Sequence, residues 1–356
     1  MPESSHPQHP QNILVIPLRY IGDTILTVPL IRNLKHHFPN ANIDVLCSQT
    51  AAPLLETCPY IRKVLIEPKG TPARLQQLRQ GNYQQVYSLR KSVTVALMCK
   101  LAGVPQVIGY DKQRFPFGYK RWGWFLDTQS HYPGLKTDIP QPISHLGLLQ
   151  ATGLAPVDNH LELWATQSDQ KAIEALLSQH GVDTTQPIAV LHAASASHGK
   201  QIDWDKFSAS LHHLHQAGYQ LLNTGTKADQ ALYHQLAQST GLPLVNLAGK
   251  TTLRETVALY QRIQLLLTVD SSPIHLGAAA GVPHIVGVFG PTNQKQWGPH
   301  HAGIQFRPVF VDLPCRPCYA KVCEHNNCKV QLTGAQIAES VKALSLHSTL
   351  LEQENR

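Results

Sequence analysis

The sequence predicts two α/β domains, each a parallel sheet with helices on both faces. Strand-like and helix-like segments alternate through residues 12–109 and again through residues 187–290. Such alternation produces parallel sheets, because each crossover places a helix between consecutive strands. The segment 167–186, QSDQKAIEALLSQHGVDTTQ, separates the two runs. We therefore expect Rossmann-like domains at 1–165 and 187–332, facing a central cleft, with a connecting segment at 166–186 and a C-terminal helix and tail at 333–356.

The first run begins with a strand at 12–18, NILVIPL. The segment 24–38 is helical by the spacing of its apolar residues, although Pro29 indicates that the regular helix starts late. Further short strands follow at ANIDVLCS (41–48), RKVLIEP (62–68), QQVYSL (84–89) and PQVIGY (105–110). Aromatic residues, prolines and basic residues interrupt this rhythm between residues 110 and 145.

The second run contains five apolar strands: PIAVLHA (187–193), YQLLNTG (219–225), LPLVNLAG (242–249), IQLLLTVD (263–270) and PHIVGVFG (283–290). A helix of small residues, about 273–280, lies between the last two, and Gly281 and Pro283 end it. A closing helix is expected at 333–347.

Composition favours a cytoplasmic globular protein with anionic partners. Hydrophobic residues make up 42% of the chain and charged residues 15%, and neither a bilayer-length apolar run nor an apolar signal core is present. The net charge of +7 suits phosphorylated metabolites or a membrane surface. Lys and Arg are dispersed, so we expect no nucleic-acid partner.

Four cysteines gather in CRPCYAKVCEHNNC, residues 315–328. A structural disulfide is not expected in the cytosol. Cys315, Cys318, Cys323 and Cys328 suit either packed and surface thiols or, as the weaker interpretation, a metal site. Because the spacing lacks two separated ligand pairs, the thiol interpretation is favoured, and no metal is predicted.

The stretch VDSSPIHLG, which follows the 263–270 strand, is the main candidate site. In open parallel sheets ligands bind beyond the carboxyl ends of strands. With Ser272 as N-cap and Pro273 as first helical residue, the first helical turn would present N–H groups and the positive end of its dipole to a diphosphate. His275 would donate to phosphate or orient Asp270. The alternative is a capped helix with a satisfied histidine; the loop Gly290-Pro291-Thr292 on the same side favours a ligand.

Two further loops end strands of the second domain. HAASASHGKQIDW (192–204) supplies hydroxyls such as Ser195 and the ammonium of Lys200, which suit phosphate, although a solvated serine-rich loop is the alternative. Asp229, in GTKAD, is either an acceptor for ribose hydroxyls or an acid at a helix start.

The corresponding turn of the first domain is RYIGDT, residues 19–24. Asp23 is either an N-cap carboxylate or a general base that accepts a proton from a sugar hydroxyl. The N-cap interpretation is weakened because Thr24 would cap equally well.

Taken together, these motifs resemble glycosyltransferase family 9, the ADP-heptose:lipopolysaccharide heptosyltransferases. The resemblance covers nearly the whole chain: GDTILTVPLIRNLKHHFPNANID, NLAGKTTLRE, VDSSPIHLGAAAGVPHIVGVFGPT and the cysteine-rich segment carry it. It implies a GT-B architecture with an N-terminal acceptor-binding domain and a C-terminal nucleotide-sugar-binding domain. It also implies inverting transfer of a heptose from ADP-heptose without a cofactor or catalytic metal.

The resemblance also assigns roles by position. Asp23 corresponds to the general base, Asp229 to the ribose-binding acid and Asp270 to the contact with the transferred sugar. The remaining donor contacts are Ser195, Lys200, Ser271, Ser272 and His275, with Gly290, Pro291 and Thr292 beside them. Two positions depart from the family: Ser272 replaces a usual Gly and Asp229 a usual Glu, which bears on the choice of donor.

The sequence therefore predicts a monomeric lipopolysaccharide core heptosyltransferase that works at the cytoplasmic face of the inner membrane. Its acceptor is expected to be a phosphorylated, lipid-linked oligosaccharide held by Arg19, Thr24, Arg90, Lys91 and the basic, aromatic segment 110–124. The alternatives are a family 9 transferase with another nucleotide-sugar or a protein acceptor, and a non-catalytic regulator that binds a nucleotide-sugar.

Overall fold

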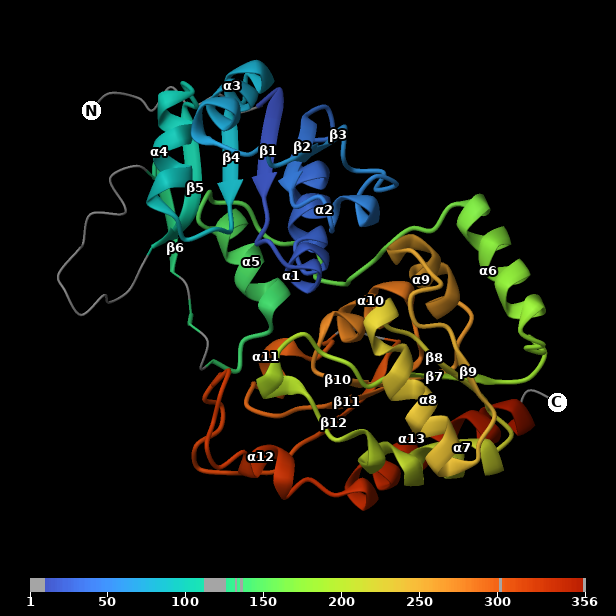
Figure 1. Cartoon of the computed structure of the whole chain (residues 1–356). Coiled ribbons are helices and arrows are strands. Elements are labelled where there is room, and N and C mark those ends of the chain that lie inside the picture. The colour runs from blue at the N-terminus through green and yellow to red at the C-terminus, as the bar shows by residue number, and fades with distance from the viewer. Residues whose placement is uncertain (1–9, 112–125, 132, 135–136, 301–302, 355–356) are drawn as a thin grey trace. The chain divides into compact units, whose positions relative to one another are not determined.

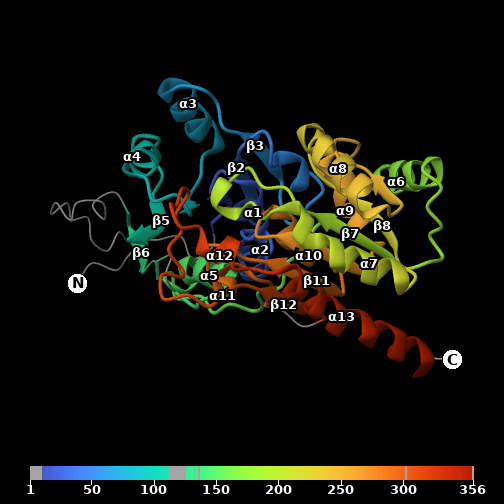
Figure 2. The same cartoon turned by 60° about the horizontal axis from the view of Figure 1, so that its bottom comes forward.

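The computed structural model describes residues 10–111, 126–131, 133–134, 137–300 and 303–354. Two compact units divide the chain: one of residues 1–134 and 141–161, the other of residues 135–140 and 162–356. Each contains a six-stranded parallel sheet, so the predicted α/β class is confirmed (Figures 1 and 2). The predicted domain boundaries stay predictions.

The N-terminal unit orders its strands β3-β2-β1-β4-β5-β6. Helices α3 and α4 pack together on one face of the sheet, and α2 and α5 on the other (Figure 2). Its elements are β1 (Asn12–Ile16), α1 (Ile21–Ile25), α2 (Val28–His37), β2 (Asn42–Cys47), η1 (Ala52–Leu54), β3 (Lys63–Ile66), α3 (Thr71–Gly81), β4 (Gln85–Ser88), α4 (Val93–Leu101), β5 (Gln106–Asp111), β6 (Thr128–His131) and α5 (Gln141–Gln150).

The C-terminal unit orders its strands β12-β11-β10-β7-β8-β9. Helices α7 and α13 pack on one face, and α9 and α10 on the other (Figure 1). Its elements are α6 (Gln167–Gln179), β7 (Ile188–His192), η3 (His198–Lys200), η4 (Trp204–Phe207), α7 (Ser208–Gln216), β8 (Gln220–Asn223), η5 (Lys227–Asp229), α8 (Gln230–Thr240), β9 (Leu244–Asn246), α9 (Leu253–Tyr260), β10 (Leu265–Val269), α10 (Ser272–Ala280), β11 (His284–Val288), α11 (Gln294–Trp297), β12 (Gln305–Val309), α12 (Asn327–Val330) and α13 (Gly334–Glu354).

The two sheets share one topology, because reading the second from β9 to β12 gives the same sequence of crossovers as β3 to β6. In both, the strand order reverses beside the first strand, between β1 and β4 and between β7 and β10. Ligands of doubly wound sheets bind in the crevice at such a switch point, outside the carboxyl ends of the strands. The fold therefore marks one candidate site in each unit.

The central strands form where the sequence is continuously apolar. All five residues of β10 and of β11 are buried, as expected for central strands covered on both faces. The predicted helix 24–38 is instead two helices: α1 ends at Ile25, and α2 starts at Val28 with Pro29 at its second position. Pro29 lacks the N–H that would continue the ladder, which is the physical reason for the late start.

Four elements differ from expectation at their ends or in their existence. The closing helix runs to Glu354 rather than 347. Strands β6 and β12, and the helix α6 inside the expected connecting segment, were not predicted. Within the part of the chain that the structure describes, no helix is long and apolar enough to cross a bilayer.

Candidate functional site

The switch point of the C-terminal unit holds a buried ion pair. Asp270, directly after β10, is 2% exposed, and its Oδ2 lies 2.9 Å from the Nζ of Lys200, which follows β7. The hydroxyl of Thr292, from the loop after β11, donates to the same oxygen. Three predicted donor residues are therefore brought together, since neighbouring parallel strands present their carboxyl ends at one edge.

Helix α10 starts one residue earlier than predicted. Ser271, with an extended φ of −152°, is the N-cap, and Ser272 is already helical, so the assignment of Ser272 as N-cap is wrong. Pro273 then stands at the second helical position. The Ser271 side chain makes no capping bond, and the Ile274 N–H donates to the Ser271 carbonyl at 3.1 Å. The first turn therefore has fewer orphan N–H groups than an ideal helix.

Two polar atoms at this helix start are buried without a hydrogen-bond partner among the described residues: Ser271 Oγ and His275 Nδ1. Burial lowers the pKa of His275 to about 4; Asp270 opposes this shift and Lys200 adds to it. The imidazole is therefore neutral at physiological pH. Because native structures satisfy most buried polar groups, such orphans beside a strand-end loop point to a ligand that completes them.

Trp297, at the end of α11, lies beside His275 and Lys200. Its ring centroid lies 6.3 Å from that of His275 and 5.8 Å from Lys200 Nζ. Cations are attracted to the face of an indole ring at such distances. The sequence analysis missed Trp297, although it follows the Gly290-Pro291-Thr292 loop by only five residues.

The cysteine-rich segment packs against the two loops that carry Lys200 and Thr292. Arg316 donates to the carbonyl oxygens of Gly290 (2.6 Å), Thr292 (2.8 Å) and Val311 (3.1 Å). A Cβ on Gly199 would lie 2.5 Å from the carbonyl oxygen of Ala320, so glycine permits this close approach. The segment therefore supports the two loops that carry Lys200 and Thr292.

The cysteines of this segment form no disulfide in the structure. Cys315, Cys318 and Cys323 are exposed and Cys328 is half-buried. Among the described residues, no group of three or more His, Cys, Asp or Glu side chains is arranged to hold a metal ion.

Two other predicted donor residues lie in neighbouring loops. Asp229 completes a capping box at η5, where its Oδ2 accepts from the backbone N–H and the hydroxyl of Thr226 at 2.7 and 2.8 Å. It is thus an acid at a helix start, and its ribose contact stays a prediction. Ser195 Oγ accepts from the Ser197 N–H at 3.3 Å within the loop after β7.

In the N-terminal unit, Asp23 is the third residue of α1, whose N-cap is Tyr20. The N-cap interpretation of Asp23 is therefore wrong. Asp23 as a whole is 9% exposed, and its backbone carbonyl accepts from the Thr27 hydroxyl at 2.8 Å. Thr24 is fully buried and its hydroxyl donates to the Tyr20 carbonyl at 3.0 Å, and its contact with an acceptor stays a prediction.

The other predicted acceptor residues lie at the carboxyl ends of β1 and β4. Arg90 is 8% exposed at its side chain; its Nη1 lies 2.8 Å from Glu67 Oε1 and its Nε donates to the Pro17 carbonyl. Arg19, 62% exposed, reaches the same Glu67 oxygen at 3.4 Å. Burial lowers the pKa of Arg90. Burial would raise the pKa of Glu67, but Arg90 and Arg19 outweigh it and hold that pKa below its usual range.

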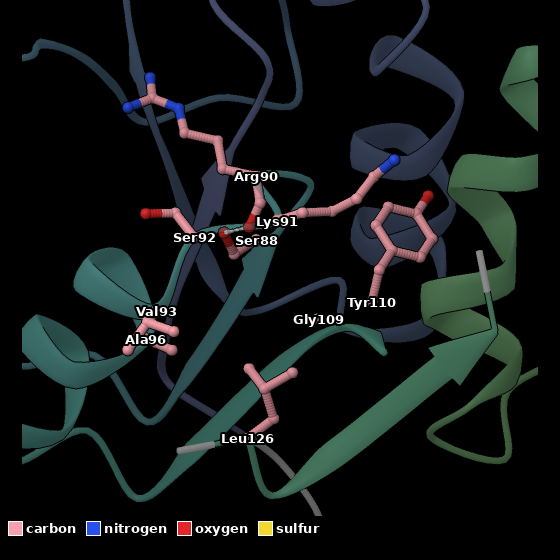
Figure 3. A pocket seen from close by; sticks show the side chains of 9 residues that line it. All are labelled: Ser88, Arg90, Lys91, Ser92, Val93, Ala96, Gly109, Tyr110 and Leu126. Atoms are coloured by element: carbon pink, nitrogen blue, oxygen red, sulfur yellow. Dashed lines mark hydrogen bonds between the residues drawn. The ribbon is translucent and has the colours of Figure 1, made fainter. Parts of the chain in front are cut away.

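Lys91 lines a small pocket, partly open to solvent, between β4, β5 and the start of α4 (Figure 3). The Lys91 side chain lies beside the Tyr110 ring, whereas the Arg90 side chain points away from both. Residues 112–124 of the predicted basic, aromatic segment lie outside the described residues.

A family model, "Glycosyltransferase family 9 (heptosyltransferase)", matches residues 73–329. The chain belongs to this family. It is therefore a glycosyltransferase, and the identification made from its motifs is confirmed.

Relatives of known sequence and relatives of known structure agree with this assignment. The chain is 29% identical to lipopolysaccharide heptosyltransferase 3 of Escherichia coli, over 79% of this chain and 84% of that protein. Its fold matches that of a family 9 glycosyltransferase from Veillonella parvula (TM-score 0.79, 19% identity, 96% and 98% of the chains). It also matches the E. coli ADP-heptose lps heptosyltransferase II (TM-score 0.74, 21% identity, 95% and 99%). The predicted GT-B architecture is confirmed by this likeness.

Proposed function

We propose that this family 9 member transfers a heptose from ADP-heptose to a lipopolysaccharide inner-core acceptor. The observation that carries the proposal is the group at the β7/β10 switch point. There Lys200 and Thr292 hold Asp270, while Ser271 Oγ and His275 Nδ1 are buried without partners among the described residues. Two of the three proteins named above are heptosyltransferases, and the name of one of them contains ADP-heptose.

The donor diphosphate binds at the start of α10. The Lys200 ammonium and the positive end of the α10 dipole stabilise the charge that develops on the leaving ADP. Neutral His275 donates one hydrogen bond to a phosphate oxygen, and Asp270 accepts from a hydroxyl of the transferred sugar. Asp229 accepts from the ribose, and Ser195 contacts a phosphate or the sugar.

Transfer proceeds with inversion at the anomeric carbon. An acceptor hydroxyl oxygen attacks from the face opposite the diphosphate and forms the new C–O bond. The bond to the ADP oxygen breaks with its electron pair on ADP, and the hydroxyl proton passes to the Asp23 carboxylate. A carboxylate suits this role because its oxygen accepts a proton from an activated hydroxyl. These reaction steps require no cofactor or metal.

The acceptor is a phosphorylated glycolipid at the cytoplasmic face of the inner membrane, where the protein binds peripherally as a monomer. The net charge of +7 supports attraction to that anionic surface. A single chain carries every residue that the proposal uses.

Calorimetric titration with ADP-, UDP- and GDP-sugars tests the donor assignment. We expect ADP-heptose to bind more tightly than the UDP and GDP sugars, and preference for UDP would contradict the assignment. With acceptor present, NMR of the product's anomeric proton reports inversion or retention. Tight binding of ADP-heptose without release of ADP that depends on Asp23, assayed with Asp23→Ala, would instead identify a non-catalytic regulator.

A further inference from the structure

Three arginines of the N-terminal unit converge on one carboxylate oxygen. Glu67 lies just after β3. Its Oε1 is 2.8 Å from Arg90 Nη1, 3.4 Å from Arg19 Nη2 and 3.5 Å from Arg74 Nε. We call these four residues the arginine cluster. We propose that the arginine cluster binds a phosphate monoester carried by the acceptor saccharide. This inference rests on the proposed function and specifies the chemistry of its acceptor.

The charge of the cluster is unbalanced. Three guanidinium cations against one carboxylate leave an excess of two positive charges within contact distance. A phosphate monoester carries a charge of about −1.5 to −2 near pH 7, so it compensates this excess. A carboxylate ligand would leave one charge uncompensated.

The geometry leaves donors for a second anion. Charge-assisted N–H···O bonds are typically about 2.7–2.9 Å, so the contacts of Arg19 and Arg74 with Glu67 are long and weak. Arg90 Nη2 is buried and has no hydrogen-bond partner among the described residues. A purely structural ion pair between Glu67 and Arg90 would need neither of the other two arginines.

The position of the cluster is that of a ligand site. Arg19 follows β1 and Arg90 follows β4, and the Arg90 Nε donates to the Pro17 carbonyl across the switch point of this sheet at 2.9 Å. Asp23, the proposed base, also follows β1. Guanidinium groups suit phosphate because their planar fork matches two of its oxygens.

Binding of inorganic phosphate and methyl phosphate to the full chain tests the cluster. Saturating ADP is present throughout, because the donor site also binds phosphate groups. The variant Arg19→Gln/Arg74→Gln, which spares the buried Arg90, is expected to lower the affinity for both ligands at least about tenfold. Acetate at equal ionic strength is expected to bind more weakly than phosphate to the unaltered chain.

Arg79→Gln is the matched control. Arg79 is exposed on the same helix as Arg74, and its guanidinium donates to the Leu101 carbonyl at 3.1 Å, away from Glu67. Its phosphate affinity should equal that of the unaltered chain. Equal affinity in the double variant and the unaltered chain, or an equal loss in Arg79→Gln, would overturn the proposal.

A second arm separates a saccharide phosphate from a lipid headgroup. Methyl phosphate is compared with vesicles that contain phosphatidic acid, whose headgroup is also a phosphate monoester. Loss of vesicle binding in the double variant, with methyl phosphate binding unchanged, would assign the cluster to lipid and contradict the proposal. Because these measurements need no turnover, they can fail while heptosyl transfer is observed, and can succeed where it is not.

Discussion

Replacing Lys200 with methionine separates two roles of the buried pair at the donor edge. The Lys200→Met change removes the charge and keeps much of the side-chain volume. It leaves the Asp270 carboxylate, 2% exposed, with the Thr292 hydroxyl as the remaining partner that the structure records at this oxygen. Both the stability of the C-terminal unit and the affinity for ADP should therefore fall.

The size of the stability loss follows from the geometry. Two unit charges 2.9 Å apart attract by about 6 kcal/mol at an effective dielectric constant of about 20. Desolvation offsets part of this, and the Lys200 side chain is 28% exposed, which screens the pair. Removing one partner of a buried pair typically costs about 3–5 kcal/mol, and we expect the lower end, about 3 kcal/mol.

The assay is a double-mutant cycle with Asp270→Asn. Urea unfolding followed by tryptophan fluorescence gives the free energy of unfolding, and calorimetry gives the dissociation constant of ADP. In the double variant we expect stability to return to within about 1 kcal/mol of the unaltered chain, because no unpaired charge stays buried. The affinity for ADP should stay at least about tenfold weaker, because the contact with the diphosphate is still missing.

The result that refutes this reasoning is full recovery of ADP affinity in the double variant. Lys200 would then serve only to neutralise Asp270, and the diphosphate would be held by other groups.

Two further predictions concern Arg316 and two buried histidines. Arg316→Gln should raise the donor KM about tenfold by releasing the Gly290 and Thr292 carbonyls, whereas Arg307→Gln, an exposed control on β12, should not; equal KM values would contradict the supporting role. Burial lowers the pKa of His145 and His275 from 6.5 to about 4. Between these two pH values each histidine is protonated in the unfolded chain and neutral in the folded chain. Each histidine should therefore lower the free energy of unfolding by about 2 kcal/mol as the pH falls from 6.5 to 5, and should leave it unchanged above that range. A His275→Asn variant whose free energy of unfolding has the same pH dependence as that of the unaltered chain would contradict this.

Much of the fold follows from local sequence. The apolar runs before Asp270 and Gly290 predict β10 and β11 because central parallel strands are buried on both faces. Strand β12, Gln305–Val309, escapes this pattern: it is an edge strand, partly exposed, and contains Pro308. Helix α6 begins with a capping box, Thr166 with Asp169, and this pattern is readable in the sequence as a helix start.

The site was predictable as a set of loops but not as a set of contacts. Strand-end position alone identifies the loops of Lys200, Asp270 and Thr292. Their convergence on one oxygen depends on β7 lying beside β10 and β10 beside β11, and strand order is set by long-range packing. For the same reason the contacts of Glu67 could not be predicted from the sequence. Glu67 lies far in sequence from Arg19 and Arg90, and only the order of the strands brings the three residues together.

The role of Asp23 is tested most directly by the isosteric change Asp23→Asn. Single-turnover transfer from saturating ADP-heptose measures the chemical step apart from binding. We predict that the rate falls by about 10²- to 10⁴-fold while the affinity for ADP-heptose is unchanged, because only proton acceptance is lost. A rate within a few-fold of that of the unaltered chain would show that another group removes the proton, and would contradict the account.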